Sequence, residues 1–367
     1  MGKKIIIAVT NDLSGDQRIH RIATTLAENG FEVQVVGRKL PESQPLSPRI
    51  YQAHRMKLWF RRGKGFYIEY NLRLLGHLLR QKPEIINAND LDTLGAAYLA
   101  AKFMRAELIY DSHEYFTEVP ELIGRPFTQK IWLLLESWIF PRLKKVYTVN
   151  HAIAQIYTQK YRVPVKVVRN LPLRRESLPT SLLSSRILLY QGALNIGRGL
   201  ELMIETMNYL PEYNLHIIGR GDISEKLLKL VAEQEVKNVS FHGFIPFESL
   251  FKLTEQACLG MSLEEDRGAN YRYSSPNKVY DYIQAGVPVL VSDLPVMREV
   301  VETYRTGQIL PNDSRTPERL AEKIRGIVED ENDYPILKQN CRKAALELNW
   351  QEEQAVLLKI YQNPNLS

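Results

Sequence analysis

A strand, a loop and a helix alternate along almost the whole of this chain, and this alternation restricts its fold more than any other feature. The apolar run 4–9 is expected to form a strand, 16–29 a helix that ends at Gly30, and 31–36 the next strand. This order is the unit of a parallel sheet. It recurs from residue 187 onward, with strands expected at 187–190, 215–218, 239–241 and 259–263. The chain is therefore predicted to form two doubly wound α/β domains.

Composition sets the domain limits and excludes several classes of protein. A chain of 367 residues with 44% apolar residues is long enough for two globular domains. We expect a first domain at 1–172, a linker rich in Pro, Ser and Leu at 173–185, a second domain at 186–345 and a closing segment at 346–367. Cys258 and Cys341 lack ligand-like spacing, so neither disulfides nor a metal centre is expected. The longest apolar stretch, 131–140, is shorter than the ~20 residues of a membrane span, and a cytoplasmic protein is predicted.

Charge divides the chain unevenly. Residues 1–180 carry 28 Lys and Arg against 16 Asp and Glu, whereas the remainder carries 20 against 26. Such a division indicates two domains with different partners, the basic one facing an anionic surface, substrate or polymer. Within it, Trp59 and Phe60 stand among five cations in the segment 55–64. This segment is interpreted either as a contact with an anionic membrane surface or as a solvated loop whose aromatic rings pack on the core.

The segment SSPNKVYDYIQAGVPVLVSD, residues 274–293, is typical of a loop, helix and buried strand. Ser274 or Ser275 is expected to cap a helix that starts at Pro276, and Gly286 should follow its end. The start of a helix attracts phosphate, and Lys278 adds a charge there. Asp281, one turn further on, could bind ribose hydroxyls. The pattern favours a nucleoside diphosphate site, although an ordinary capped surface helix has the same spacing.

Polar residues of the first domain gather where its parallel strands end. Ligands of such folds bind at the carboxyl ends of the strands. Gly15 is expected to allow a tight turn in the loop after the first strand. Asp90 and Asp92 are interpreted as a helix cap and its neighbour rather than a metal site. His113 is a candidate base, hydrogen-bond donor or ordinary loop residue. The residues expected at this edge are Asn11, Gly15, Asp16, Arg18, Asn89, Asp90, His113 and Glu114.

The second domain has glycine-rich loops in the corresponding places. Gly192, Gly197 and Gly199 allow a close approach of the backbone to a ligand, and Arg198 is the natural cation for a diphosphate. Arg198 and Lys278 should converge if their loops share one sheet edge. Tight turns with a solvated arginine would give the same pattern. The chain has neither the glycine fingerprint of dinucleotide-binding proteins nor a GxxxxGK phosphate loop, so NAD and ATP are not indicated, and no feature points to nucleic acid.

Several motifs in order resemble those of glycosyltransferase family 4, whose members are retaining enzymes with the GT-B fold. They are NDLSGDQRIHRIATTLAENGFEVQVV, YDSHEYF, QGALNIGRGLE, HIIGRGD, VSFHGFIP and SPNKVYDYIQAGVPVLVSD. The resemblance implies two Rossmann-like domains that face a central cleft, with a last helix at about 350–361 that returns to the first domain. It also implies transfer of a sugar from a nucleotide sugar, most naturally a UDP- or GDP-sugar, without a metal or other cofactor. The acceptor would be a glycan, lipid-linked or protein hydroxyl, in polysaccharide or glycoconjugate biosynthesis, at the inner face of the membrane.

The resemblance assigns roles to individual residues. His113, Arg198 and Lys278 are the expected catalytic residues. The donor would contact Gly15, Gly192, Arg198, Gly219, Gly243, Phe244, Ser275, Asn277, Lys278 and Asp281, and the acceptor Asn11, Asp16, Arg18, Asn89, Asp90 and Glu114.

The chain also departs from the family pattern. Asp281 replaces the second glutamate of a paired-glutamate motif, the first falls near Tyr273 and Ser274, and Ala193 replaces an arginine. Glu264 or Glu265 could supply the missing contact to the sugar. A catalytically weak, nucleotide-sugar-binding partner subunit and a GT-B nucleotide-sugar epimerase are the alternative hypotheses.

Overall fold

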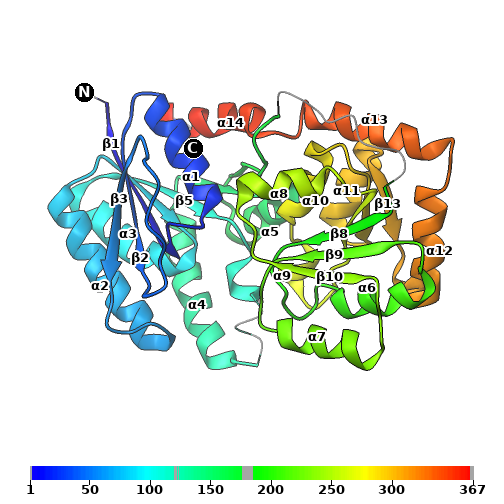
Figure 1. Cartoon of the computed structure of the whole chain (residues 1–367). Coiled ribbons are helices and arrows are strands. Elements are labelled where there is room, and N and C mark those ends of the chain that lie inside the picture. The colour runs from blue at the N-terminus through cyan, green and yellow to red at the C-terminus, as the bar shows by residue number, and fades with distance from the viewer. Residues whose placement is uncertain (1, 120–121, 123, 176–184, 364–367) are drawn as a thin grey trace. The chain divides into compact units, whose positions relative to one another are not determined.

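The computed structural model describes residues 2–119, 122, 124–175 and 185–363 (Figure 1). The chain divides into two compact units. The first contains Met1–Asn170 and Glu353–Ser367, and the second contains Leu171–Glu352. Each unit is an α/β domain built on its own parallel sheet.

The first unit is built on a seven-stranded sheet in the order β3-β2-β1-β4-β5-β6-β7, with every neighbouring pair parallel. Its strand β1 is apolar and buried, since Ile5, Ile6 and Ile7 are all completely buried, as expected for a sheet that is covered on both faces. The strands are β1 (Lys4–Asp12), β2 (Glu32–Lys39), β3 (Gln52–Lys57), β4 (Ile85–Asn89), β5 (Glu107–Ser112), β6 (Lys145–Thr148) and β7 (Val165–Val167).

Helices cover both faces of this sheet. The crossover through α1 runs from β1 to β2, whereas the later crossovers run in the opposite direction along the sheet, toward β7. Because βαβ crossovers are right-handed, α1 lies on one face of the sheet and the helices of the later crossovers lie on the other. In agreement, α2, α3 and α4 pack side by side (Figure 1). The helices are α1 (Gln17–Glu28), α2 (Gly63–Gln81), α3 (Leu91–Met104), α4 (Pro126–Ile139), α5 (His151–Tyr161) and α14 (Trp350–Gln362).

The end of α14 is part of the first unit's core. Tyr361 is buried and its hydroxyl accepts a hydrogen bond from Asn87 Nδ2. The same hydroxyl lies 3.4 Å from the hydroxyl of Tyr147. Lys145 Nζ donates to the carbonyl oxygen of Ile360 at 2.6 Å, which satisfies one of the carbonyl groups left free at a helix end. The last turns of the chain are therefore fixed to β4 and β6.

The second unit repeats the architecture with a six-stranded parallel sheet in the order β10-β9-β8-β11-β12-β13. One buried cluster includes Leu188, Met203 and Ile324, and another includes Val279, Tyr282 and Val289. The strands are β8 (Ile187–Gln191), β9 (Asn214–Ile218), β10 (Val239–Gly243), β11 (Leu259–Ser262), β12 (Val289–Ser292) and β13 (Gly307–Leu310). The helices are α6 (Leu200–Thr206), α7 (Ser224–Glu233), α8 (Phe247–Thr254), α9 (Ala269–Arg272), α10 (Asn277–Gln284), α11 (Pro295–Tyr304), α12 (Pro317–Val328) and α13 (Asp333–Ala345).

The structure corrects three local expectations. A strand that was not expected, β3, overlaps the start of the basic segment 55–64. Neither Ser274 nor Ser275 caps α10: Ser274 Oγ donates to the carbonyl of Tyr271, Ser275 Oγ contacts the hydroxyl of Tyr280, and Pro276 stands at the N-cap. Leu171, just before the expected linker, is fully buried in the second unit. Linker residues 176–184 lie outside the described residues.

We expect Tyr361→Phe to lower the free energy of unfolding of the first unit by about 1–2 kcal/mol, because the Asn87 amide loses a buried partner. Urea unfolding measures the change. Tyr98→Phe in the same unit is the matched control: its ring packs on Trp138, and its hydroxyl has no hydrogen-bond partner among the described residues. Equal effects of the two substitutions would contradict the proposed anchoring of α14.

Candidate functional site

Glycines bring the strand ends of the second unit close together at the carboxyl edge of its sheet. Gly219 follows β9 with a φ of +140°, and a Cβ atom there would lie 1.8 Å from the carbonyl oxygen of Gly192. Any other residue would displace the backbone after β8. Gly192 in turn packs against Lys278, since a Cβ atom at this glycine would lie 3.2 Å from Lys278 Cε. This close packing places the start of α10 beside the end of β8.

A buried carboxylate joins the two predicted cations at this edge. Glu264 follows β11 and is completely buried. Its Oε1 lies 2.6 Å from Lys278 Nζ and 3.4 Å from Arg198 Nη1, while its Oε2 accepts from Ser262 Oγ at 2.7 Å. Arg198 and Lys278, which lie 80 positions apart in the sequence, therefore converge on one group.

Two aromatic rings support the cations. Lys278 Nζ lies 4.5 Å from the ring centre of Tyr190, and the Arg198 guanidinium lies 5.3 Å from that of Tyr271, within the range of cation–π attraction. Burial acts to raise the pKa of Glu264, but Lys278 and then Arg198 outweigh it, so this pKa is lowered overall. Glu264 is thus an anion, and one of the two positive charges remains for a ligand.

The other predicted donor residues of the second unit lie at the carboxyl edge of its sheet at different depths. Asp281 accepts a hydrogen bond from Gln191 Nε2 at 3.0 Å, and Thr254 Oγ1 donates to Gln191 Oε1 at 2.8 Å. Asn277 is exposed at the first turn of α10, whereas Ser275 is half-buried. Phe244 is 69% exposed beside Gly243 at the end of β10. These positions place a carboxylate, an amide and an exposed ring along the same sheet edge.

In the first unit, a strained residue orients the predicted histidine. Asp90 lies between β4 and α3 with φ 56° and ψ 170°, a region otherwise occupied almost only by glycine. Its Oδ1 accepts from the backbone N–H of His113 at 3.1 Å, and its Oδ2 lies 2.8 Å from His113 Nδ1. The side chain does not cap α3, as the sequence suggested, but instead holds both the backbone and the ring of His113.

Electrostatics fix the protonation of this histidine. Burial acts to lower the pKa of His113, but Asp90 and, less strongly, Glu114 raise it to about 10. His113 is therefore a cation at neutral pH and a hydrogen-bond donor rather than a base. Burial, and then repulsion by Asp90, raise the pKa of Asp92 to about 7. Asp92 Oδ2 accepts from Thr10 Oγ1 at 2.6 Å.

Several predicted acceptor residues have internal partners. Arg18 is buried and forms a 2.7 Å ion pair with Asp111, and the buried Asn89 Nδ2 donates to Asn87 Oδ1 at 2.5 Å. Asp16 caps α1 by accepting from the N–H of Ile19, and Asn11 Nδ2 donates to Asp16 Oδ2. Arg18 and Asn89 thus lie beneath the edge, whereas Asn11 is exposed on it.

Gly15 is a further correction. Gly15 has no left-handed φ, and a Cβ atom there would meet nothing within 4 Å, so the turn does not require a glycine. Among the described residues, no group of three or more His, Cys, Asp and Glu side chains could hold a metal ion. The open space beside Gly15 leaves the backbone of this loop accessible.

Solved structures share this architecture. Sucrose-phosphate synthase from Thermosynechococcus elongatus superposes with a TM-score of 0.80 at 17% identity, over 98% of each chain. HepE from Anabaena, in complex with UDP and glucose, superposes with a TM-score of 0.75 at 15% identity, over 98% of this chain and 99% of the other. The fold is the two-domain, Rossmann-like GT-B fold.

The family follows from sequence models. Residues 16–171 match the model described as Glycosyltransferase Family 4, and residues 179–345 match Glycosyl transferases group 1. The chain belongs to glycosyltransferase family 4. It is also 22% identical over 360 residues to the chitobiosyldiphosphodolichol beta-mannosyltransferase of Kluyveromyces lactis, over 83% of this chain and 78% of the relative.

We expect Asp90→Asn to keep the shape of the Asp90–His113 contact and to lower the pKa of His113 from about 10 toward its ordinary value of 6.5. A raised pKa in the folded state stabilises the fold fully below pH 6.5, and this stabilisation is lost as the pH rises through about 10. The variant should therefore lose the part of the pH dependence of unfolding that His113 contributes. NMR titration of the ring, assigned with His113→Gln, measures the pKa, and titration of the parent near 6.5 would contradict the assignment.

Proposed function

We propose that the chain transfers a sugar, with retention of its anomeric configuration and without a metal ion, from a UDP- or GDP-sugar to a hydroxyl of a lipid-linked glycan. The observation that carries this proposal is the convergence of Arg198 and Lys278 on the buried Glu264. A nucleoside diphosphate leaves with additional negative charge. Two fixed cations, held by one carboxylate and by aromatic rings, provide positive charge where that charge develops.

The proposed reaction breaks the bond between the anomeric carbon and the diphosphate oxygen. The acceptor hydroxyl oxygen forms the new bond on the same face, and its proton passes to the departing phosphate oxygen. Glu264 is not available as a nucleophile, because it is buried and held by Lys278, Arg198 and Ser262. His113, as a cation fixed by Asp90, donates a hydrogen bond from Nε2 to a sugar hydroxyl. The HepE complexes with UDP and UDP-glucose support a nucleoside diphosphate sugar as donor.

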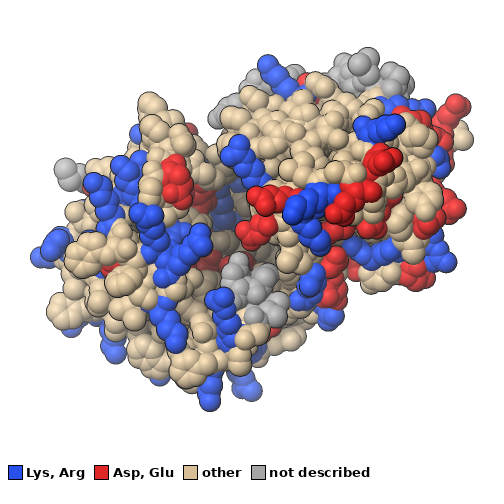
Figure 2. Space-filling view, turned by 60° about the horizontal axis from the view of Figure 1, so that its bottom comes forward, with Lys and Arg blue, Asp and Glu red and all other residues tan. Residues whose placement is uncertain are grey.

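The proposed acceptor is a saccharide on a lipid diphosphate. The name of the Kluyveromyces lactis relative describes such an acceptor, since chitobiosyldiphosphodolichol is a disaccharide joined to a lipid by a diphosphate. In this chain, the basic first half is suited to an anionic acceptor (Figure 2). No helix in the described part of the chain is long and apolar enough to cross a membrane. A surface contact would then bring the protein to its acceptor at the cytoplasmic face.

Exposed aromatic rings beside cations support this membrane contact. Trp59 is 84% exposed with the guanidinium of Arg73 4.9 Å from its ring centre. Phe127 on α4 is exposed with Lys64 Nζ at 5.1 Å. Exposed apolar side chains continue over the outer sides of α2, α3 and α4 at Ile68, Leu72, Leu99, Phe103, Ile131, Leu134 and Trp138. Aromatic and aliphatic side chains with adjacent cations are the composition of a surface that inserts among anionic headgroups.

The transfer proposal is tested with labelled UDP- and GDP-sugars, lipid extract as acceptor, and EDTA in the buffer. We expect transfer by the parent and a ten- to hundredfold lower kcat/KM for Arg198→Ala, because a charge-assisted contact to the diphosphate is lost. An α-linked donor should give an α-linked product, measured by the proton coupling at the anomeric carbon. A β-linked product would contradict retention, and a strict magnesium requirement would contradict metal-independent transfer.

Arg272→Ala is the matched control, because this exposed arginine of the same unit pairs with Asp266 and makes no contact with Glu264. It should retain the parent's activity. Donor binding without transfer to any acceptor would favour the partner-subunit hypothesis, and interconversion of free nucleotide sugars would favour an epimerase.

A further inference from the structure

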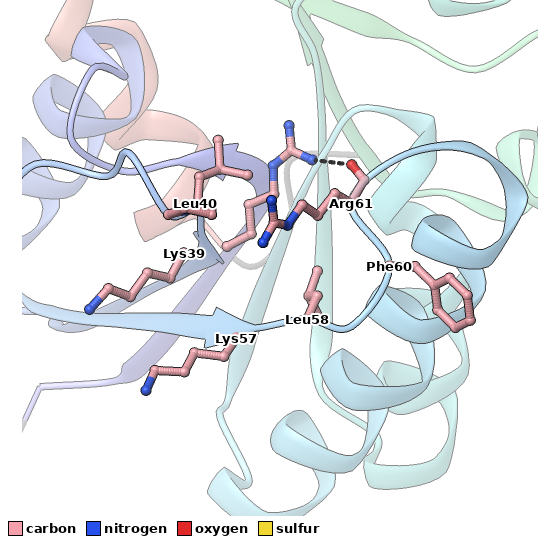
Figure 3. A pocket seen from close by; sticks show the side chains of 8 residues that line it. Lys39, Leu40, Lys57, Leu58, Phe60 and Arg61 are labelled. Atoms are coloured by element: carbon pink, nitrogen blue, oxygen red, sulfur yellow. Dashed lines mark hydrogen bonds between the residues drawn. The ribbon is translucent and has the colours of Figure 1, made fainter.

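A basic cavity lies at the carboxyl ends of β2 and β3, at one end of the first unit's sheet (Figure 3). Its volume is about 260 Å³. This is below the roughly 300–1,000 Å³ of pockets that enclose drug-sized ligands, so it suits a small group rather than a whole nucleotide sugar. The lining contains four cations and no carboxylate: Arg38, Lys39, Leu40, Pro41, Lys57, Leu58, Phe60 and Arg61.

Three of these four cations, Lys39, Lys57 and Arg61, are exposed to solvent, and two of them are like charges at facing positions. Lys39 and Lys57 are direct register partners on β2 and β3, and their side chains point the same way in Figure 3. Like charges in directly opposed positions destabilise a sheet. Among the described residues, none of the four cations forms an ion pair with an Asp or Glu side chain. Positive charge has therefore accumulated here without an internal counter-charge.

The cavity is also held in a defined shape. Arg38 Nη1 donates to the carbonyl of Arg61 at 3.3 Å, and its guanidinium lies 4.7 Å from the ring centre of Phe66. The buried Arg38 Nε has no hydrogen-bond partner within the described residues. On the far side of the loop, Glu69 accepts hydrogen bonds from the backbone N–H groups of Trp59 and Phe60 at 2.9–3.0 Å. These hydrogen bonds therefore fix the loop that closes the cavity to α2.

We propose that this cavity binds the diphosphate of the lipid-linked acceptor. The inference rests on the proposed function and adds the place where the acceptor's charged group is held. Several cations around one small cavity match the several charged oxygens of a diphosphate. The exposed Trp59 and Phe60 stand next to the cavity, where the lipid enters the membrane surface.

The position of the cavity agrees with the position of His113. Three strand spacings separate β2 from β5, and four separate β3 from β5, which corresponds to roughly 14–19 Å. His113 and Asp90 follow β5 and β4 at the same edge. A short saccharide attached to the diphosphate can cover that distance and bring its terminal hydroxyl near His113.

Vesicle co-sedimentation with the full chain tests the proposal. The vesicles are phosphatidylcholine alone, phosphatidylcholine with a polyprenyl diphosphate, and phosphatidylcholine with phosphatidylglycerol of equal total charge. We expect the parent to prefer the diphosphate vesicles, and Lys39→Gln with Lys57→Gln to lose this preference by tenfold or more. Inorganic pyrophosphate should displace the parent from those vesicles.

The control is Lys144→Gln with Lys166→Gln, which removes the same charge from exposed lysines near β6 and on β7. It should keep the preference. Equal binding of the parent to both anionic vesicles, or equal losses in both double variants, would overturn the proposal in favour of general attraction to anionic lipid. Thermal shift with UDP or GDP is measured in parallel. If pyrophosphate displaces the parent from the vesicles but neither UDP nor GDP shifts its melting temperature, the proposed function fails and the diphosphate-binding cavity stands. If UDP or GDP binds but the diphosphate vesicles are not preferred, this inference fails and the proposed function stands.

Discussion

The buried carboxylate of Glu264 is the group on which the candidate donor site of the second unit depends. A buried charge is tolerated only with partners of good geometry, and Glu264 has three: Lys278, Arg198 and Ser262. Lys278 is itself buried, and its ammonium nitrogen lies 2.6 Å from the Glu264 carboxylate. The carboxylate thus fixes two cations, one from a loop and one from α10, at one sheet edge, and it leaves one net positive charge there. The glycines at 192 and 219 make the approach possible by removing side chains from between the strand ends.

In the first unit, a residue with a strained backbone holds a charged side chain at the edge of the sheet. Asp90 adopts a conformation that costs about 1–3 kcal/mol, and in return its carboxylate holds the backbone and the ring of His113 at once. Beneath them, the buried pair of Arg18 and Asp111 joins α1 to β5. Both units therefore place a charged group at the carboxyl edge of a parallel sheet and hold it with a buried partner. The proposed roles of the two groups differ: a phosphate for Arg198 and Lys278, and a sugar hydroxyl for His113.

The sequence allowed much of this to be predicted, for reasons that differ between features. Apolar runs, glycines after helices and the order of motifs predicted the two parallel sheets and the convergence of Arg198 with Lys278. The edge strand β3 was missed because QAHRMK is mostly polar, as exposed edge strands often are. The role of Asp90 was not predictable, because it depends on a φ angle that no spacing encodes. Glu264 was expected only as a possible contact to the sugar, not as the partner of Arg198 and Lys278. A signal for Glu264 does exist: a carboxylate directly after the apolar run 259–263 has to be buried or to emerge at the ligand edge. The assignments of Arg198 to the diphosphate and of His113 to the sugar stay predictions.

The central claim is that Arg198 and Lys278 bind the donor through its diphosphate and without a metal ion. Calorimetric titration of the full chain in EDTA with the nucleoside, the nucleoside monophosphate and the nucleoside diphosphate of the preferred base tests it most directly. The account predicts that affinity increases at each added phosphate, most at the second, and that magnesium does not change the order. Equal affinity for the mono- and diphosphate, or diphosphate binding only with magnesium, would contradict it.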